Sequence, residues 1–446
     1  MPSIENAALH NGGFTPKWAG WRGGNVRREE IFVLYNAYEL QRTMLGGAAA
    51  WASIGAELLS NPALPVGYMG IGPVMASALD VFAHAAAPRG KPSFGIDKVT
   101  VGGKDHLVTE SIVLQRPFGK LLRFSHDGLG PDAPNLLIVA PMSGHFATLL
   151  RGTVARMVES CTVYITDWAD AKMVPAEAGR FDLDDYIDYL IGFLEHIGPG
   201  THMLAVCQPS VPSLAAAAVM SADKHPCRPA TLTMMGGPID TREAPTSVND
   251  LAMQQPLSWF ENNVIARVPL TYPGGGRKVY PGFLQLAGFL SMNLGSHMMS
   301  HYAMFKHLVT GDGESADGTK AFYDEYRSVC DMTSEFYLQT IEHVFQRHSL
   351  PKGEFVHRGK VIDLGAIKDT GILAIEGERD DISGIGQTKA ALHLAANLPD
   401  RLKKYYLAAE VGHYGIFNGG KWRRNIAPVV ESWIAEHSRA ELKVVA

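Results

Sequence analysis

The sequence predicts an α/β protein with a mostly parallel sheet flanked by helices. Three observations lead to this class. Short, continuous apolar runs alternate with helical patterns between residues 135 and 235. The same alternation returns after residue 371, and a long segment without comparable apolar runs separates the two parts. Continuous apolar runs are typical of parallel strands that are buried on both faces, so we expect helices to cover both sides of the sheet.

The composition fits a globular protein and argues against several classes. Of 446 residues, 46% are hydrophobic and 19% are charged, and the net charge of −5 gives no basic footprint for nucleic acid. The four cysteines are too scattered for a disulfide framework or a CxxC metal site. The first residues show no secretory signal, and the longest apolar stretch, residues 44–59, is interrupted by Glu57. We therefore expect a cytoplasmic protein with free thiols and no membrane span.

The first segment, residues 1–90, is predicted to be a helical arm. Helical spacing begins at Arg28, and the pair Gly46 and Gly47 is expected to break or end the first helix. Residues 48–87 are small and apolar. Two interpretations of them are open: an arm packed on the main domain, or an apolar patch that touches a hydrophobic substrate surface or a partner.

The remaining chain divides into three predicted segments. Residues 91–240 form the first part of the core, with short antiparallel strands at 94–125 and then the apolar runs 135–140, 161–165, 202–206 and 230–235, separated by helices at 146–158, 183–197 and after 206. Residues 241–362 form a mainly helical cap with helices at 289–309 and 320–348. Residues 363–446 complete the core, with strands at 371–376 and 404–409 and helices at 388–398 and 426–437.

Cys207 lies where an apolar strand meets a helical pattern. Pro209 suits a first helical turn, and Val211 and Leu214 begin an apolar helical spacing. A nucleophile at such a corner is the nucleophile elbow of the α/β-hydrolase fold. The positive end of the following helix would favour a thiolate there. A buried structural cysteine is the alternative for Cys207 alone.

Two residues downstream complete a catalytic pattern. Asp380 follows the predicted strand at 371–376, and His413 follows the strand at 404–409. The chain order of nucleophile, acid and histidine is that of α/β-hydrolases, in which the histidine acts as general base and the acid fixes its tautomer. Asp381 is the competing acid. The sequence thus predicts a triad of Cys207, His413 and Asp380.

The oxyanion hole is expected to use backbone N–H groups. One belongs to Gln208, and the other comes from Met142 or Ser143 in the loop after the strand at 135–140. No metal site is predicted. His297 and His301 are four residues apart on a predicted helix, but nothing nearby supplies a third ligand.

Several stretches of this chain resemble the intracellular poly(3-hydroxybutyrate) depolymerases. The stretches are AVCQPSVPSLAAAA at 205–218, VAPMSGHFATLLRGT at 139–153, VYITDW at 163–168, LDDYIDYL at 183–190, GERDDISG at 377–384 and EVGHYGIFNG at 410–419. The resemblance implies Cys207, Asp380 and His413 as catalytic residues and amorphous storage polyester at a granule surface as substrate. It implies no cofactor, with coenzyme A as an alternative acyl acceptor to water. The granule is the expected partner, and a homo-oligomer is left open.

Two rival functions are weighed against this one. Polyester synthases are similar α/β-hydrolases with a cysteine nucleophile, but their box keeps glycines on both sides of the cysteine, where this chain has Ala205 and Pro209. That difference favours the depolymerase. A non-catalytic granule-binding protein is the other rival, and an intact triad argues against it.

Overall fold

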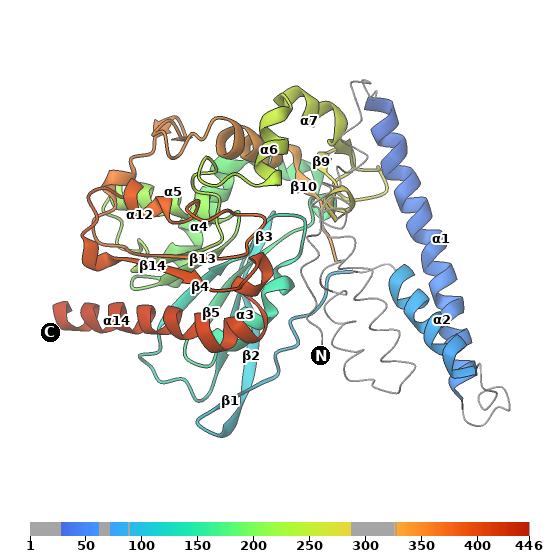
Figure 1. Cartoon of the computed structure of the whole chain (residues 1–446), viewed down its shortest axis with the longest axis horizontal. Coiled ribbons are helices and arrows are strands. Elements are labelled where there is room, and N and C mark those ends of the chain that lie inside the picture. Colours follow the sequence, from blue (N-terminus) through green and yellow to red (C-terminus); the bar gives the residue numbers. More distant parts are fainter. Residues whose placement is uncertain (1–27, 62–71, 88–89, 287–324, 326–327, 446) are drawn as a thin grey trace, which may run out of the picture.

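The computed structural model describes residues 28–61, 72–87, 90–286, 325 and 328–445, and its centre is one large sheet with helices on both faces (Figure 1). The sheet contains nine strands in the order β1-β2-β3-β5-β4-β6-β7-β13-β14. Their bounds are β1 (Lys98–Val101), β2 (Lys104–Arg116), β3 (Gly119–His126), β4 (Asn135–Val139), β5 (Thr162–Trp168), β6 (His202–Val206), β7 (Thr231–Met235), β13 (Gly371–Gly377) and β14 (Lys403–Ala408).

The strands from β5 to β14 run parallel, whereas β1, β2 and β3 are antiparallel to their neighbours. The register pairs Val206 of β6 with Met235 of β7, and Met235 with Ile375 of β13. The carboxyl ends of these three strands therefore meet at one level of the same edge. This arrangement is the predicted α/β-hydrolase fold, and the predicted class is confirmed.

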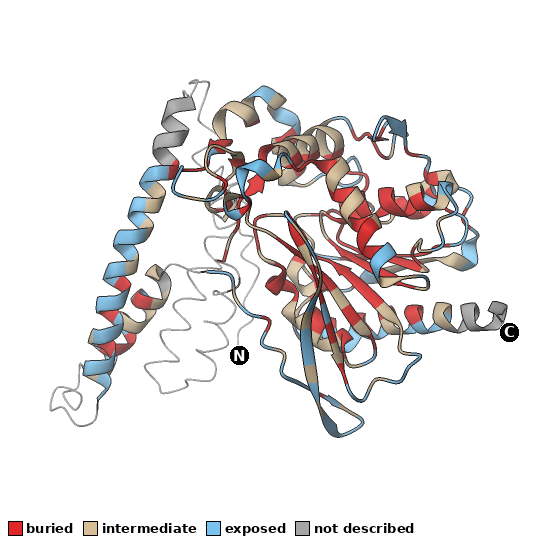
Figure 2. Ribbon diagram, turned by 180° about the vertical axis from the view of Figure 1, so that it is seen from behind, coloured by how far each residue is buried: buried red, intermediate tan, exposed pale blue. Residues whose placement is uncertain are grey.

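The sheet is buried on both faces, as the continuous apolar runs predicted. On β4, Leu137 and Val139 pack into one apolar core and Leu136 and Ile138 into the other, and all four are fully buried or nearly so. One core is closed by α4 (Leu183–Ile197), α5 (Ser210–Ala222) and α12 (Ala390–Leu394), and the other by α3 (Arg151–Met157) and α14 (Ala427–Val445). Figure 2 shows the central strands as a buried layer.

The described part of the predicted cap, residues 241–362, contains helices and small sheets. The helices are α6 (Ser247–Gln254), α7 (Leu257–Asn263) and α11 (Ser334–Thr340), which continues as a π-helical turn, η6 (Ile341–Gln346). The strands are β8 (Ala266–Arg267), β9 (Lys278–Tyr280) and β10 (Met332–Thr333) in one sheet, and β11 (Val356–His357) and β12 (Lys360–Val361) in a hairpin. The predicted helix at 289–309 lies outside the described residues.

The predicted helix at 320–348 is wrong for residues 328–333, which are extended. Cys330 N–H donates to the carbonyl of Gly144 at 2.7 Å, Val329 forms a β-bridge with His145, and Met332 pairs with Tyr280 of β9. These partners satisfy the backbone outside a helix. The helix begins only at Ser334, and residues 320–324 lie outside the described part of the chain.

The amino-terminal arm is a hairpin of two helices, α1 (Arg28–Ser60) and α2 (Gly72–Ala86), that projects from the body (Figure 1). The expected break at Gly46 and Gly47 is wrong, because α1 runs through both. Each glycine costs about 1 kcal/mol relative to alanine in a helix, but the flanking residues are good helix formers and the helix is supported by α2. Within the described residues, no helix combines the length and apolar character that crossing a membrane requires.

The remaining described helices are short. They are η3 (Ala147–Leu150), η4 (Ala171–Met173), η5 (Ala176–Ala178), η7 (Leu364–Ala366), η8 (Asp400–Leu402), η9 (His413–Ile416), α13 (Gly419–Lys421) and η10 (Trp422–Ile426). Of these, η9 matters for the site because it begins at His413.

Candidate active site

Cys207 occupies the corner between β6 and α5. Its φ is 66°, in the left-handed region that is strained for a residue with a Cβ. Two backbone hydrogen bonds hold the corner: Cys207 N–H donates to Met235 O at 2.7 Å, and Ser210 N–H donates to Cys207 O at 3.0 Å. The thiol is free and half-buried. The geometry is that of a nucleophile elbow, with the sulfur at the carboxyl edge of the sheet.

The elbow lacks glycines of its own, and a neighbouring loop provides the room it needs. Ala205 is fully buried, and Pro209 already has helical angles at φ −59° and ψ −14°. Gly237, just after β7, lies directly against this corner. A Cβ on Gly237 would come within 2.1 Å of Ser210 Oγ and 3.2 Å of Cys207 O. A glycine in the loop after the adjacent strand therefore leaves room for the elbow.

Asp380 and His413 lie together, although 33 residues separate them in the chain. The Nδ1 of His413 is 2.8 Å from Oδ2 of Asp380, and their side chains are 6% and 0% exposed. The other oxygen of Asp380 accepts hydrogen bonds from the N–H groups of Ile382 and Ser383, both at 2.9 Å. Asp381 is exposed instead. Of the two candidate acids, Asp380 is the one placed against the histidine.

The Cys207 side chain is close enough to His413 to act on its imidazole, so His413 lies between the acid and the thiol. Burial alone would lower the pKa of His413. The charges of Cys207 and Asp380 and hydrogen bonds with both outweigh burial and raise the pKa of His413 well above its usual value. A raised pKa favours the imidazolium form of His413, which is the form that can give a proton to a leaving group.

Two residues that the sequence analysis did not single out support the pair. Gly236 has a φ of 59°, and a Cβ there would lie 3.2 Å from both Asp380 Oδ2 and His413 Cε1. Glu376, on β13, is fully buried. Its carboxylate accepts from the N–H groups of Gly386, Thr388 and Lys389 and from the Tyr405 hydroxyl, at 2.8–2.9 Å. It thereby fixes the end of the loop that carries Asp380. The Gly236-Gly237 pair directly after a predicted strand was the one available signal.

The predicted oxyanion loop follows β4 at the same edge of the sheet. Among the described residues, no group accepts a hydrogen bond from the backbone N–H of Gln208, Met142 or Ser143. All three predicted donors can therefore donate to an oxyanion. The start of the loop is held at Ala140: its N–H donates to Thr166 Oγ1 and its carbonyl accepts from Trp168 Nε1, both at 2.9 Å. The far end is held by the cap strand at Gly144 and His145.

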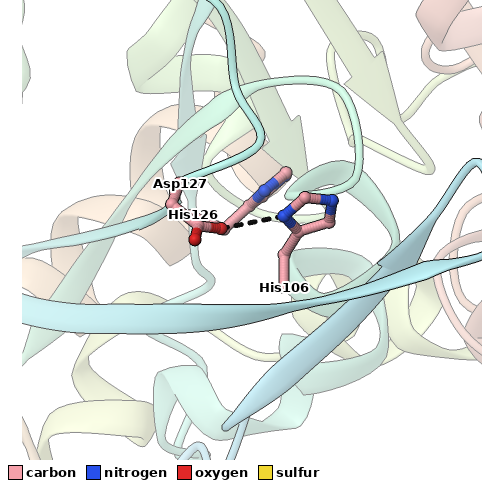
Figure 3. A group of neighbouring side chains, drawn as sticks. All are labelled: His106, His126 and Asp127. Atoms are coloured by element: carbon pink, nitrogen blue, oxygen red, sulfur yellow. Dashed lines mark hydrogen bonds and ion pairs between the residues drawn. The ribbon is translucent and has the colours of Figure 1, made fainter.

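His297 and His301 lie outside the described residues. Within the described part, one group of three potential metal-ligating side chains exists, His106, His126 and Asp127 (Figure 3). His106 Nδ1 is 2.8 Å from Asp127 Oδ1, and Gly128 N–H donates to His126 Nδ1 at 3.1 Å. The group lies at the amino-terminal edge of the parallel strands, opposite the edge that carries Cys207. It therefore takes no part in the candidate site.

A cavity of about 1280 Å³ lies between the arm and the body. Tyr38 and Leu45 of α1 form one wall, and Trp168 at the end of β5 forms another. Phe146, which directly follows the predicted oxyanion loop, also lines the cavity, whereas Cys207 does not. The cavity therefore borders the candidate site without including the thiol.

Comparison with known proteins adds two kinds of relative. Residues 236–438, somewhat less than half of the chain, match the family described as PHB de-polymerase C-terminus. Two curated relatives are described as poly(3-hydroxyalkanoate) polymerase subunit PhaC. The one from Allochromatium vinosum is 26% identical over 71% of this chain and 85% of its own length. The one from Thiocystis violacea is 26% identical over 72% of this chain and 86% of its own length. The chain is thus similar to proteins named for depolymerisation and to proteins named for polymerisation.

Solved structures with a partial likeness include two hydrolases. The monoacylglycerol lipase of Paleococcus ferrophilus is 11% identical, with a TM-score of 0.40 over 69% of this chain and 96% of its own. The 2-hydroxy-6-oxo-6-phenylhexa-2,4-dienoate hydrolase of Rhodococcus sp. strain RHA1 is 12% identical, with a TM-score of 0.40 over 75% of this chain and 99% of its own.

Proposed function

We propose that this chain hydrolyses ester bonds of amorphous poly(3-hydroxybutyrate) granules in the cytoplasm, with Cys207 as nucleophile. The observation that carries the proposal is the contact of buried His413 with both Asp380 and Cys207, at a corner whose φ is left-handed. A thiol, an imidazole and a carboxylate in this order are what nucleophilic acyl transfer requires. The match of residues 236–438 to the depolymerase family supports the substrate class.

The reaction proceeds in two steps on these residues. The Cys207 thiolate attacks the ester carbonyl, and the N–H of Gln208 with that of Met142 or Ser143 stabilises the oxyanion. The carbon–oxygen bond then breaks, and the leaving 3-hydroxyl group takes its proton from His413. Water next loses a proton to His413 and attacks the thioester, which releases the acid and restores the thiolate–imidazolium pair. The products are 3-hydroxybutyrate oligomers and monomer, and the thiol of coenzyme A can replace water in the second step.

A second function, polymerisation, has its own support, because the curated relatives are named as polymerase subunits. A polymerase would use the same nucleophile to accept a hydroxyacyl group from coenzyme A. The elbow favours hydrolysis, since Ala205 and Pro209 stand where the synthases have glycines. The two functions differ in product, which makes them separable by experiment.

The test is a comparison of Cys207→Ala with the wild type on amorphous polyester granules. We expect the release of 3-hydroxybutyrate, followed by chromatography, to fall by about 10³-fold or more, because the nucleophile is lost. Cys227→Ala, which changes another half-buried free cysteine, is the control and should keep full activity. Undiminished release by Cys207→Ala would refute the proposal.

The same assay separates the acyl acceptors and the rival function. Products are identified with and without coenzyme A, and in a second reaction the enzyme receives 3-hydroxybutyryl-coenzyme A and no polymer. Free acid in the first reaction supports hydrolysis, and hydroxyacyl-coenzyme A there supports thiolysis. Growth of polymer in the second reaction would instead assign the chain to synthesis.

A further inference from the structure

The arm carries an exposed apolar stripe on α1. We define the arm stripe as Leu40, Met44, Trp51, Ile54 and Leu58, all of which are exposed; Trp51 is 77% and Met44 65% exposed. The steps of four, seven, three and four residues place these side chains on one face of the helix. At 1.5 Å per residue the stripe is about 27 Å long. An extended stripe of this length fits a surface better than a small molecule.

The opposite face of α1 is the one that packs. Alongside α2, the buried residues of α1 are Ala49, Ala52 and Ala56, and on α2 the buried residues include Ala76 and Ala83. The hairpin thus keeps small side chains inside and presents large apolar ones to solvent, as Figure 2 shows for an arm that is mostly exposed. An ordinary amphipathic helix does the reverse. α2 adds three more exposed apolar side chains, Val74, Met75 and Phe82.

The chemistry of this surface indicates which class of partner it can bind. Between Leu40 and Leu58 and on α2, the charged side chains are Arg42, Glu57 and Asp80. Arg42, the one cation, lines the cavity and pairs with Glu39. Helices that bind anionic phospholipid or nucleic acid present lysine and arginine to it. The charge-free stripe therefore matches a partner that is neutral as well as apolar. A polyester of hydroxybutyrate units is such a material, since it offers methyl and methylene groups and uncharged ester oxygens.

The arm is also joined to the candidate site. Tyr35 of α1 donates a hydrogen bond to Asp331 at 2.5 Å. Cys330, the residue before Asp331, donates its backbone N–H to Gly144 O in the predicted oxyanion loop. The same helix lines the cavity that reaches Phe146. A surface held by the arm would consequently lie beside the cavity that borders the active-site loop.

We propose that the arm stripe is the surface through which this protein adsorbs to amorphous polyester. The identity of the polymer rests on the proposed function. A solid polymer cannot diffuse to a half-buried thiol, so the enzyme must first hold to the material, and an uncharged apolar stripe supplies that adhesion by removing its side chains from water.

The test uses the full chain with four substitutions on the stripe, Met44→Gln, Trp51→Gln, Ile54→Gln and Leu58→Gln. The matched control replaces four exposed apolar residues of the body, Leu107, Ile112, Leu270 and Val361, by Gln. Binding to amorphous polyester granules is measured by co-sedimentation, and catalysis on the soluble ester p-nitrophenyl butyrate. We expect the stripe variant to bind the granules at least about tenfold more weakly, the control to bind within about twofold of the wild type, and both to keep soluble esterase activity.

Each other outcome has a defined meaning. Undiminished granule binding by the stripe variant overturns the proposal. The proposal is also overturned if analytical ultracentrifugation shows a dimer for the wild type and a monomer for the stripe variant, while the variant still binds granules. The stripe would then be an interface between two copies of the chain. Loss of binding only to phospholipid vesicles, neutral or anionic, also overturns it. A wild type that adsorbs through the stripe but cleaves neither granules nor the soluble ester would refute the proposed function and still support the adsorption surface.

Discussion

Asp380 uses its two carboxylate oxygens for different tasks. Oδ1 accepts from two backbone N–H groups of its own loop, which fixes the carboxylate, and Oδ2 contacts Nδ1 of His413. The bond at Nδ1 selects the tautomer and leaves the other ring nitrogen for the thiol. Asp381, one residue on, is exposed and has neither function.

Asp380→Asn and Asp381→Asn should therefore behave differently. We expect kcat on granules to fall by about 10²-fold or more for Asp380→Asn and to stay within about twofold for Asp381→Asn. The pH profile gives a second readout. Burial lowers the pKa of His413, whereas Asp380 helps to raise it. Its loss should move the alkaline limb of kcat/KM to lower pH, because His413 must be protonated to release the leaving group. Equal, mild effects of the two substitutions would reject Asp380 as the acid.

At the scale of elements, the end of β7 contributes shape and no reacting group. Gly237 gives the elbow its room, and Gly236 lies under the side chains of Asp380 and His413. The parallel register places both beside Cys207. The corner after β6 therefore depends on the backbone of its neighbour in the sheet.

Gly236→Ala tests this dependence. The added Cβ would lie 3.2 Å from Asp380 Oδ2 and His413 Cε1, so we expect kcat to fall by about tenfold or more, since small displacements of catalytic groups are costly. The left-handed φ should also lower stability by about 1 kcal/mol. Gly102→Ala is the control, because Gly102 has a φ of 57° and a Cβ there would meet nothing within 4 Å. Thermal unfolding and kcat are measured for both. If the two variants lose activity equally, Gly236 has no specific role.

Much of the sheet could be predicted, because strands buried on both faces leave continuous apolar runs such as Asn135–Val139 and His202–Val206. The strands of the predicted cap could not be predicted from the sequence, because strands of two or three residues are too short to show periodicity. Val329, Met332 and Phe336 have helical spacing, yet the first two are extended, since their partners are His145 and Tyr280, far away in the chain. Chain order predicted Cys207, Asp380 and His413 as a group, and the structure places Asp380 against His413. The supporting roles of Gly236 and Glu376 depend on contacts between strands, which no local pattern reveals.

At the scale of the whole molecule, Asp331 is where the arm, the cap and the body meet. Its carboxylate accepts from Tyr35 of α1 and from the N–H of Gly282, and Asp170 and Lys172 from the segment after β5 also face it. Burial, and then the charge of Asp170, raise the pKa of Asp331 to about 6. A carboxyl group whose pKa is raised by folding makes its full contribution to the stability of the folded state at pH values below its pKa in the unfolded chain. That contribution is lost as pH rises through its pKa in the folded protein, about 6.

Asp331→Asn should remove this pH dependence. We expect the stability of the variant relative to the wild type to increase by on the order of 2 kcal/mol between pH 4 and pH 7. The difference between the two proteins is the quantity to measure, because burial lowers the pKa of His202 to about 4 and gives both proteins an opposite trend. Urea unfolding at a series of pH values provides it. A difference that does not vary with pH would show that Asp331 keeps an ordinary pKa.

The place of β13 beside β7 has a consequence for how the protein is made. The two strands pair residue by residue, yet β7 ends at Met235 and β13 begins at Gly371. Closing so long a connection is slow compared with local folding. During synthesis, Cys207 emerges from the ribosome long before Asp380 and His413. A nascent chain therefore carries the thiol without the two side chains that lie near it in the folded protein, and the candidate site forms only when the carboxyl-terminal strands join the sheet.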